Sequence, residues 1–228
     1  MPNSVQDLQG TGTVRSGETP KPCRWSISGS TQIRAATTGP GHMRNSYTDE
    51  GICGMFRVED RYVRAKRTIY MEPVCKDSCV EFFVQPEEDS DYFNFGFNCG
   101  GALLCSYITD PERTAEGFKK FIPLPVEDGN QVAVHHSLPE TVDPEISELV
   151  SWMLEFFVPF ALLEKYAGSL GDPAGQEWRA NFYKCGDETS HPYWASWQPL
   201  HSLNFHLLEC FGKIRFVRFE AAGCSDKN

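Results

Sequence analysis

Alternation of apolar and polar residues dominates the middle of the chain. Residues 79–85 place valine and phenylalanine on one face and Glu81 on the other. Residues 92–98 repeat the pattern, with three phenylalanines opposite Asn94 and Asn98. A period of two is typical of strands that bury one face. We therefore predict two neighbouring strands whose phenylalanine-rich faces enter a core, while the opposite faces meet solvent or a binding site.

The same reasoning predicts further strands along the chain. Their ranges are 54–58, 62–70, 102–108, 131–135, 149–158, 178–183 and 213–219. A short helix is expected to begin at Pro159 and to end before Gly168, because proline suits the first helical turn and glycine the C-terminal cap. The proline-rich stretch 110–147 is otherwise expected to be loop-rich. Short strands with one small helix indicate an all-β fold, an antiparallel β-sandwich of jelly-roll-like type.

The distribution of this pattern divides the chain into three segments. Residues 1–45 are rich in Gly, Ser, Thr and Pro and show little periodicity, so we expect mostly irregular structure there. The ordered domain is predicted to span residues 46–220, and residues 221–228 form a tail.

Charge and hydropathy narrow the classes of partner. The net charge of -10 argues against nucleic acid, because phosphate binding requires clustered Lys and Arg. No window reaches about 18 apolar residues, so no membrane span is predicted. The first residues lack the apolar region of a signal peptide, and the default expectation is a cytoplasmic protein.

The nine cysteines are scattered and show no CxxC spacing, which argues against a zinc ribbon. An odd number would leave one thiol over in a complete disulfide framework. We expect mostly reduced, partly buried cysteines that pack as small apolar residues.

A cluster of aromatic residues follows the strand predicted at 178–183. The strand is expected to break at the turn-forming residues 185–187, and His191, Trp194 and Trp197 follow closely. Rings with polar tips beside Asn, Asp and His side chains suit a binding face for sugars. The alternative is that these rings cap the core, because Trp and Tyr are often mostly buried.

Catalytic interpretations find less support in the residues. Glycoside hydrolysis needs two facing carboxylates about 5 to 9.5 Å apart. The candidates are Glu81, Glu155 and Asp187, and nothing in the sequence pairs them. A nucleophile formed by Cys185 with His191 rests only on their closeness in sequence. We therefore predict no catalytic residues, and we keep a salt bridge of Glu81 as the structural alternative to a binding role.

The sequence offers few candidate ligands for a metal ion or a haem. A metal site through His191 and His206 would need Asp187 as its third ligand. The adjacent residues His135 and His136 could supply only one inward-pointing haem ligand. The sequence therefore predicts no cofactor and leaves the metal ligands unassigned.

A series of segments in fixed order carries a resemblance to a known family. The segments are 77–83, 92–98, 159–163, 178–187, 196–197, 204–206 and 210–212. Together they resemble the family 9-like carbohydrate-binding domains, relatives of the family 9 modules attached to xylanases. The resemblance covers roughly residues 47–219 and implies a β-sandwich that binds glycans without cleaving them, linked to polysaccharide catabolism.

The resemblance also implies individual roles. In the xylanase-attached modules two tryptophans sandwich a sugar end beside a glutamate, an arginine and an asparagine. The glutamate falls on Glu81, whereas Cys75 stands at or next to one tryptophan and Gly96 near the arginine. The second tryptophan falls near Phe205 and the asparagine near Ser202.

The 9-like subgroup carries a polar set of its own. In this chain that set is Asn181, Lys184, Asp187, His191 and His206. Calcium is structural in the xylanase modules, so structural calcium is the one cofactor that the resemblance leaves open.

We therefore predict a non-catalytic domain whose partner is a glycan or oligosaccharide. The predicted carbohydrate-binding residues are Glu81, Asn94, Asn98, Asn181, Asp187, His191, Trp194, Trp197, Phe205 and His206. With Cys75 in place of one stacking ring, only one side of the sugar would be held, which predicts millimolar dissociation constants. The alternative is a structural or partner-binding accessory β-sandwich whose ancestral sugar site has decayed.

Overall fold

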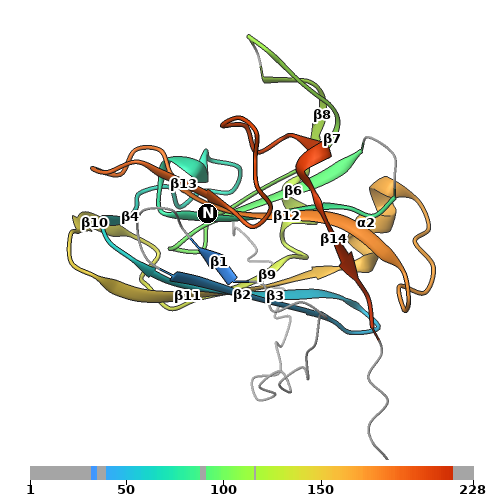
Figure 1. Cartoon of the computed structure of the whole chain (residues 1–228), viewed down its shortest axis with the longest axis horizontal. Coiled ribbons are helices and arrows are strands. Elements are labelled where there is room, and N and C mark those ends of the chain that lie inside the picture. The colour runs from blue at the N-terminus through green and yellow to red at the C-terminus, as the bar shows by residue number, and fades with distance from the viewer. Residues whose placement is uncertain (1–31, 35–39, 88–90, 116, 218–228) are drawn as a thin grey trace, which may run out of the picture.

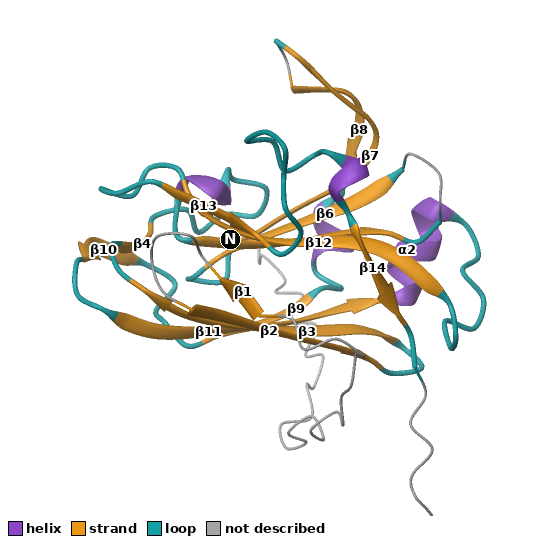
Figure 2. Cartoon of the chain, in the orientation of Figure 1, coloured by secondary structure: helices purple, strands orange, loops and turns teal. Residues whose placement is uncertain are grey.

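The structure is a computed structural model that describes residues 32–34, 40–87, 91–115 and 117–217. Two antiparallel sheets pack face to face, and most of the connecting loops lie at the edges of this sandwich (Figure 1). Strands greatly outnumber helices (Figure 2). The prediction of an all-β antiparallel sandwich is therefore confirmed.

The first layer has five strands within the described residues, in the order β1-β2-β3-β11-β9. Their bounds are β1 (Gln32–Arg34), β2 (Pro40–Tyr47), β3 (Gly51–Asp60), β11 (Val150–Pro159) and β9 (Ala133–His136). Strands β3 and β11 pair over ten residues, from Gly51 opposite Pro159 to Asp60 opposite Val150. This long ladder is the centre of the layer.

The second layer follows the order β13-β12-β5-β6-β7-β8, with β14 also paired to β12. Its strands are β13 (Tyr193–Ser196), β12 (Glu177–Gly186), β5 (Cys79–Gln85), β6 (Tyr92–Asn98), β7 (Leu103–Thr114), β8 (Gly117–Pro123) and β14 (Gly212–Arg215). The distal part of the β7–β8 hairpin projects away from the sandwich (Figure 1). The second layer therefore offers an outer face that loops and this hairpin can border.

Small elements complete the described structure. Strands β4 (Val63–Ala65) and β10 (Val142–Ile146) form a two-stranded sheet. The helical elements are α1 (Val126–Gly129), α2 (Phe160–Ala167), η1 (Val74–Lys76) and η2 (Leu208–Cys210). No described helix has the length and apolar character needed to cross a membrane.

The core lies between the two layers and is built from stacked phenylalanine rings. Phe82 and Phe182 stack with centroids 5.2 Å apart, and Phe97 stacks on Phe156 at the same distance. Gly54 lies directly opposite Phe156 in the β3–β11 ladder. A Cβ atom at Gly54 would approach the Phe156 ring to 2.2 Å, so only glycine leaves room for this ring.

Several predicted elements match the structure closely. Strands β5 and β6 have the predicted bounds, and α2 ends at Gly168, whose positive φ of 87° suits a glycine cap. The predicted strands at 149–158 and 178–183 correspond to β11 and to the longer β12. Local patterning thus located the elements that build the core.

Other expectations were wrong for the described residues. The stretch 110–147 is not mainly loop, because it holds the end of β7, all of β8 and β10, α1 and β9. Only 63–65 of the predicted strand 62–70 is a strand, and it pairs with β10 rather than with the preceding strand. Strand β1 and most of β2 lie inside the segment expected to be mostly irregular.

The remaining residues of the segment 1–45 and the tail 221–228 lie outside the described residues. The domain boundaries at 46 and 220 therefore stay a prediction. Six cysteines within the described ranges carry free thiols; they are Cys75, Cys79, Cys99, Cys105, Cys185 and Cys210.

Candidate functional site

A cavity of about 490 Å³ opens on the outer face of the second layer. Its floor comes from the outward-facing positions of adjacent strands, including Glu81 on β5 and Asn94 on β6. The segment 203–206 and the residues around η1 form its walls. The lining residues are Pro73, Val74, Cys75, Glu81, Asn94, Gly96, Leu104, Arg113, Phe118, Cys185, Asp187, Trp194, Leu203, Asn204, Phe205 and His206.

The cavity gathers part of the residue set predicted from the sequence. The predicted residues that line it are Glu81, Asn94, Asp187, Trp194, Phe205 and His206. The predicted residues outside it are Asn98, Asn181, His191 and Trp197. Period-two alternation explains the first two members, since it turns Glu81 and Asn94 away from the core.

The two asparagines outside the cavity use their amide groups within the fold. Asn98 Nδ2 donates to Arg67 O at 2.7 Å and to Asp77 Oδ2 at 3.0 Å, while its Oδ1 accepts from two backbone N–H groups. Asn181 Oδ1 accepts from the backbone N–H of Gln198 at 3.0 Å. Both side chains stabilise loops that cover the outer face.

The aromatic cluster at 191–197 divides between three places. Residues 193–196 form β13, so alternation buries Tyr193 and Ala195 while it exposes Trp194 toward the cavity. Trp197 packs on the core ring of Phe182 at 5.4 Å, as the core-capping alternative proposed. His191 stacks on Tyr62 with ring centroids 3.7 Å apart, outside the cavity.

Lys184 of the predicted polar set faces the sandwich interior. Its Nζ lies 2.9 Å from Asp60 Oδ2, and both side chains are almost fully buried. Alternation along β12 explains this orientation, because Trp178, Ala180 and Phe182 on the same side of the strand belong to the core.

The lining residues outside the predicted set include Arg113, Phe118 and Asn204, which add polar or aromatic side chains. Arg113 and Phe118 are register partners in the β7–β8 hairpin, and the Arg113 guanidinium lies 3.9 Å from the Phe118 ring centroid. Arg113 thus supplies an arginine to the cavity, whereas glycine stands at Gly96, near the position of the arginine in the xylanase-attached modules. Recognition of a long hairpin in the expected loop region would have found both residues.

Glu81 lies at the cavity floor in an environment that disfavours its charge. Burial raises its pKa to about 7; hydrogen bonds from the Cys185 and Cys79 thiols oppose this shift and nearby Asp187 reinforces it. None of the ion pairs among the described residues includes Glu81, so the salt bridge considered as the structural alternative is not formed there. Arg64 instead contacts Asp77, and Lys66 contacts Asp143.

The other polar side chains are held by specific contacts. Trp194 Nε1 donates to Asp187 Oδ1 at 2.8 Å, which fixes the indole at the cavity edge. The Tyr92 hydroxyl lies 2.6 Å from His206 Nδ1. Burial, with a further effect of Arg113, lowers the pKa of His206 to about 3, so the imidazole is neutral at physiological pH.

The structure also places the residues of the catalytic and metal sites that the sequence left as alternatives. Cys185 and His206 line the cavity and His191 lies outside it, so neither the Cys185–His191 nucleophile nor a His191–His206 metal pair is assembled. Of the two histidines considered as haem ligands, His136 has a contact within the fold, with its Nδ1 2.7 Å from Leu138 O. The structural calcium that the resemblance implies stays a prediction.

Replacement of Glu81 by glutamine should change how stability depends on pH. The folded carboxyl releases its proton near pH 7 and the unfolded one near 4.5. Its contribution to stability is therefore fully present below pH 4.5 and is lost as the pH rises through 7. The wild type should therefore lose free energy of unfolding relative to Glu81→Gln as the pH rises. From about pH 5 to about pH 8, the difference between the two proteins should shift by about 2 kcal/mol in favour of the variant. Urea unfolding at both pH values measures this difference.

Glu155→Gln supplies the control, because Glu155 is a solvent-exposed strand carboxylate on β11. Its difference from the wild type should be the same at both pH values. A Glu81→Gln variant with no such pH-dependent gain would contradict the assignment of a protonated, buried carboxyl.

A second hollow of about 350 Å³ adjoins the cavity. The two share Trp194, Leu203 and Phe205 as lining residues. The Phe205 ring stacks on Tyr183 with centroids 4.1 Å apart, so a buried tyrosine supports this shared wall.

Comparison with known proteins places the fold and this cavity in context. Carbohydrate-binding family 9 matches residues 38–216. A candidate carbohydrate-binding protein from Bacteroides uniformis shares 28% sequence identity, with 84% of this chain and 86% of that chain covered and a TM-score of 0.72. No match was found among curated proteins.

A carbohydrate-binding module of family 9 from Caldicellulosiruptor kristjanssonii, solved in complex with cellotriose, is similar in fold alone. It shares 11% identity over 90% of this chain and 88% of that chain, with a TM-score of 0.50. The family match covers most of the chain and every residue that lines the cavity. The chain therefore belongs to carbohydrate-binding family 9.

Proposed function

We propose that the 490 Å³ cavity binds the terminal sugar of a glycan and that the chain does not cleave it. The cavity volume lies within the range of about 300 to 1,000 Å³ that is typical of small-molecule sites. Membership of a carbohydrate-binding family supports the ligand class. Aromatic rings and convergent polar groups occur together in this cavity.

The observation that carries this proposal is the carbonyl oxygen of Asn94. Asn94 Oδ1 is buried at the cavity floor and has no hydrogen-bond partner among the described residues. An unsatisfied buried acceptor costs about 1 to 3 kcal/mol. A sugar hydroxyl can donate to this oxygen, so ligand binding would remove the cost.

The other lining groups complement a sugar in the same way. Trp194 is 41% exposed and presents an indole face, and Phe205 and Phe118 add further ring surface. Apolar rings suit the C–H face of a sugar, while polar groups select its hydroxyls. Arg113 donates only, and neutral His206 can donate or accept, so the cavity offers both hydrogen-bonding roles.

The second hollow favours an oligosaccharide over a single sugar. It continues past Trp194 and Phe205, so a chain whose end occupies the first cavity could extend over the shared wall. The cellotriose in the structure of the family 9 module from C. kristjanssonii makes β-glucans the first ligands to test.

Truncation of the exposed indole should weaken glycan binding. Loss of one stacking platform is worth about 1 to 3 kcal/mol by analogy with nucleobase stacking, which corresponds to about 5- to 150-fold in affinity. We expect millimolar binding of cellobiose or xylobiose by the wild type and at least about fivefold weaker binding by Trp194→Ala. NMR titration of the full chain measures both dissociation constants.

Two further variants separate this cavity from the wider site predicted from the sequence. Asn94→Ala should weaken binding without loss of stability, because it removes an unsatisfied buried oxygen. His191→Ala should leave binding unchanged, because His191 stacks on Tyr62 outside the cavity. Unaltered affinity in Trp194→Ala and Asn94→Ala would move the site elsewhere.

The titration samples also test the absence of cleavage. Chromatography after prolonged incubation should show intact ligand, and turnover that Glu81→Gln abolishes would overturn the non-catalytic proposal. If no glycan changes the chemical shifts, the result would instead favour the second candidate, an accessory domain with a decayed sugar site. Cys75 at the position of a stacking tryptophan supports this second candidate.

A further inference from the structure

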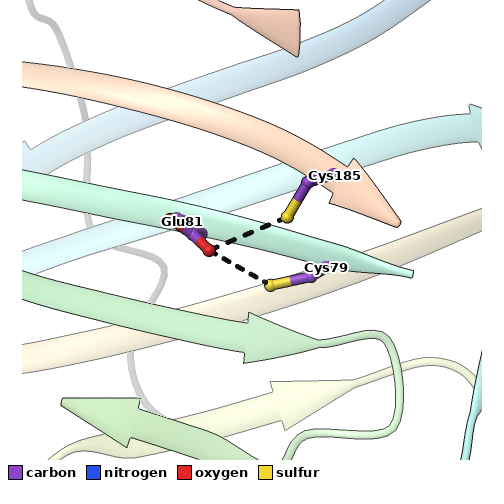
Figure 3. Close-up of side chains that lie close together, drawn as sticks. All are labelled: Cys79, Glu81 and Cys185. Atoms are coloured by element: carbon purple, nitrogen blue, oxygen red, sulfur yellow. Dashed lines mark hydrogen bonds between the residues drawn. The ribbon is translucent and has the colours of Figure 1, made fainter. Parts of the chain in front are cut away.

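Two thiols and a carboxylate converge at and just beneath the floor of the cavity, which Glu81 and Cys185 line. Cys185 Sγ lies 3.7 Å and Cys79 Sγ 3.8 Å from the same oxygen, Oε1 of Glu81 (Figure 3). The three ligating atoms all lie within 4.8 Å of one another, and all three side chains are buried. Cys79 and Cys185 are direct register partners in adjacent strands, so the end of the β5–β12 ladder fixes their positions.

These separations fit the edges of a tetrahedral zinc site. With Zn–S bonds of about 2.3 Å and a Zn–O bond of about 2.0 Å, tetrahedral geometry puts sulfur and oxygen ligands about 3.5 Å apart. The observed sulfur–oxygen distances exceed this by only a few tenths of an ångström. A cation could therefore occupy the space between the three groups with small side-chain rotations.

The charge environment points to a cation independently of these distances. Glu81 is 7% exposed, and no Lys, Arg or His lies within ion-pair distance of it among the described residues. Glu81 is therefore costly to ionise, and a bound cation would stabilise its ionised form. The thiols are weak hydrogen-bond donors and compensate little of this cost.

We propose that Cys79, Glu81 and Cys185 bind a thiophilic divalent cation of the zinc class. Sulfur ligands exclude calcium and magnesium, which prefer sites made of oxygen ligands alone. This site goes beyond glycan binding and has its own readout, although Glu81 belongs to both.

Cys75 is the candidate for the fourth ligand, from outside the group of three ligating atoms. It lines the same cavity and packs against the cluster of Val74, Cys79 and Cys185. If Cys75 does not coordinate, water from the open cavity takes this position.

The binding reaction balances without an oxidant or a reductant. Each coordinating thiol releases its proton to solvent as the sulfur–metal bond forms, and a protonated Glu81 releases its proton as the oxygen–metal bond forms. One metal ion therefore displaces two protons from the thiols and a third from Glu81 wherever that carboxyl is protonated. The pKa of Cys185 is lowered by its hydrogen bond with Cys79 but raised by burial and by Glu81, to about 11, so this thiol is protonated before metal binds.

Cobalt titration of the full chain under a non-thiol reductant tests the site. We expect thiolate-to-cobalt charge-transfer absorption, the visible bands of four-coordinate cobalt, saturation at one ion per chain, and displacement by zinc. Cys79→Ser and Cys185→Ser should each lower the cobalt affinity by at least about tenfold, since even changes in groups that only orient ligands cost about 10- to 100-fold. Glu81→Gln should weaken binding while it keeps the charge-transfer absorption.

Cys53→Ser is the matched control, because Cys53 lies on β3 in the opposite layer. Circular dichroism verifies that each variant is folded, and Glu81→Gln keeps the test informative if a serine variant does not fold. A wild type without cobalt absorption, or with absorption unchanged in all three ligand variants, overturns the proposal. A mass loss of two hydrogens on aeration, with no cobalt absorption under reductant, would instead identify a Cys79–Cys185 disulfide and also overturn it.

Discussion

Replacement of Asp77 by alanine should lower the free energy of unfolding by about 3 to 5 kcal/mol, the range found when one partner of a buried ion pair is removed. The Asp77 side chain is fully buried just before β5. It accepts hydrogen bonds from Arg64 Nε at 3.3 Å and from Arg67 Nη1 at 3.1 Å. It also accepts from the backbone N–H groups of Lys66 and Arg67 and from Asn98 Nδ2.

The size of this effect follows from the number of donors that alanine would leave unpaired. The side chains of Arg64 and Arg67 are only 15% and 18% exposed, so water cannot fully replace the carboxylate. The same contacts hold the segment that leads into η1, which supplies Val74 and Cys75 to the cavity. We therefore expect a partial loss of ligand binding along with the loss of stability.

Urea unfolding of Asp77→Ala, Asp77→Asn and Asp143→Ala separates this network from surface charge. Asp143 pairs with Lys66 at 2.9 Å, but both side chains are more than 40% exposed. Such a pair is worth about 0 to 1 kcal/mol. Asp77→Asn should fall between the other two variants, because it keeps the shape but loses the charge. A cost below about 1 kcal/mol for Asp77→Ala would show that the network does not stabilise the fold.

The second large effect is expected at the ion pair that joins the two layers. Asp60 ends β3 in the first layer, and Lys184 lies on β12 in the second, with Nζ and Oδ2 2.9 Å apart. The Tyr193 hydroxyl donates to the same oxygen at 3.0 Å, and Lys184 Nζ lies 3.3 Å from the centroid of the Tyr193 ring. Asp60→Ala should lower the free energy of unfolding by about 3 to 5 kcal/mol, because it leaves a buried ammonium without its counter-ion.

The double variant makes this prediction specific to the pair. Lys184 Nζ has no well-aligned hydrogen bond, so its contact with Asp60 is mainly electrostatic. Burial lowers the pKa of Lys184, and Asp60 counteracts this shift. Lys184→Met combined with Asp60→Leu should therefore be more stable than either single variant, since hydrophobic replacement of a buried pair is often neutral or stabilising. Additive losses in a double-mutant cycle would contradict this account.

Local patterning determined the central strands β5, β6, β11 and β12 and which way the side chains of β5 and β6 point. Alternation in 79–85 and 92–98 gave strand bounds that the structure reproduces, and it turned Glu81 and Asn94 outward. The helix between Pro159 and Gly168 follows from the backbone preferences of these two residues. These features depend on neighbours in the sequence, so the sequence alone is sufficient to predict them.

The tertiary structure alone decided which outward-facing residues meet in one cavity. Asn94 and Asn98 lie on the same face of β6, yet the segment around Asp77 covers Asn98 and leaves Asn94 at the cavity floor. Arg113 reaches the cavity only because β7 and β8 form a long hairpin. Cys79 and Cys185 are more than a hundred residues apart, and the register of β5 with β12 brings their thiols to Glu81. Such contacts depend on strand order, register and loop coverage, which residue spacing along the chain does not specify.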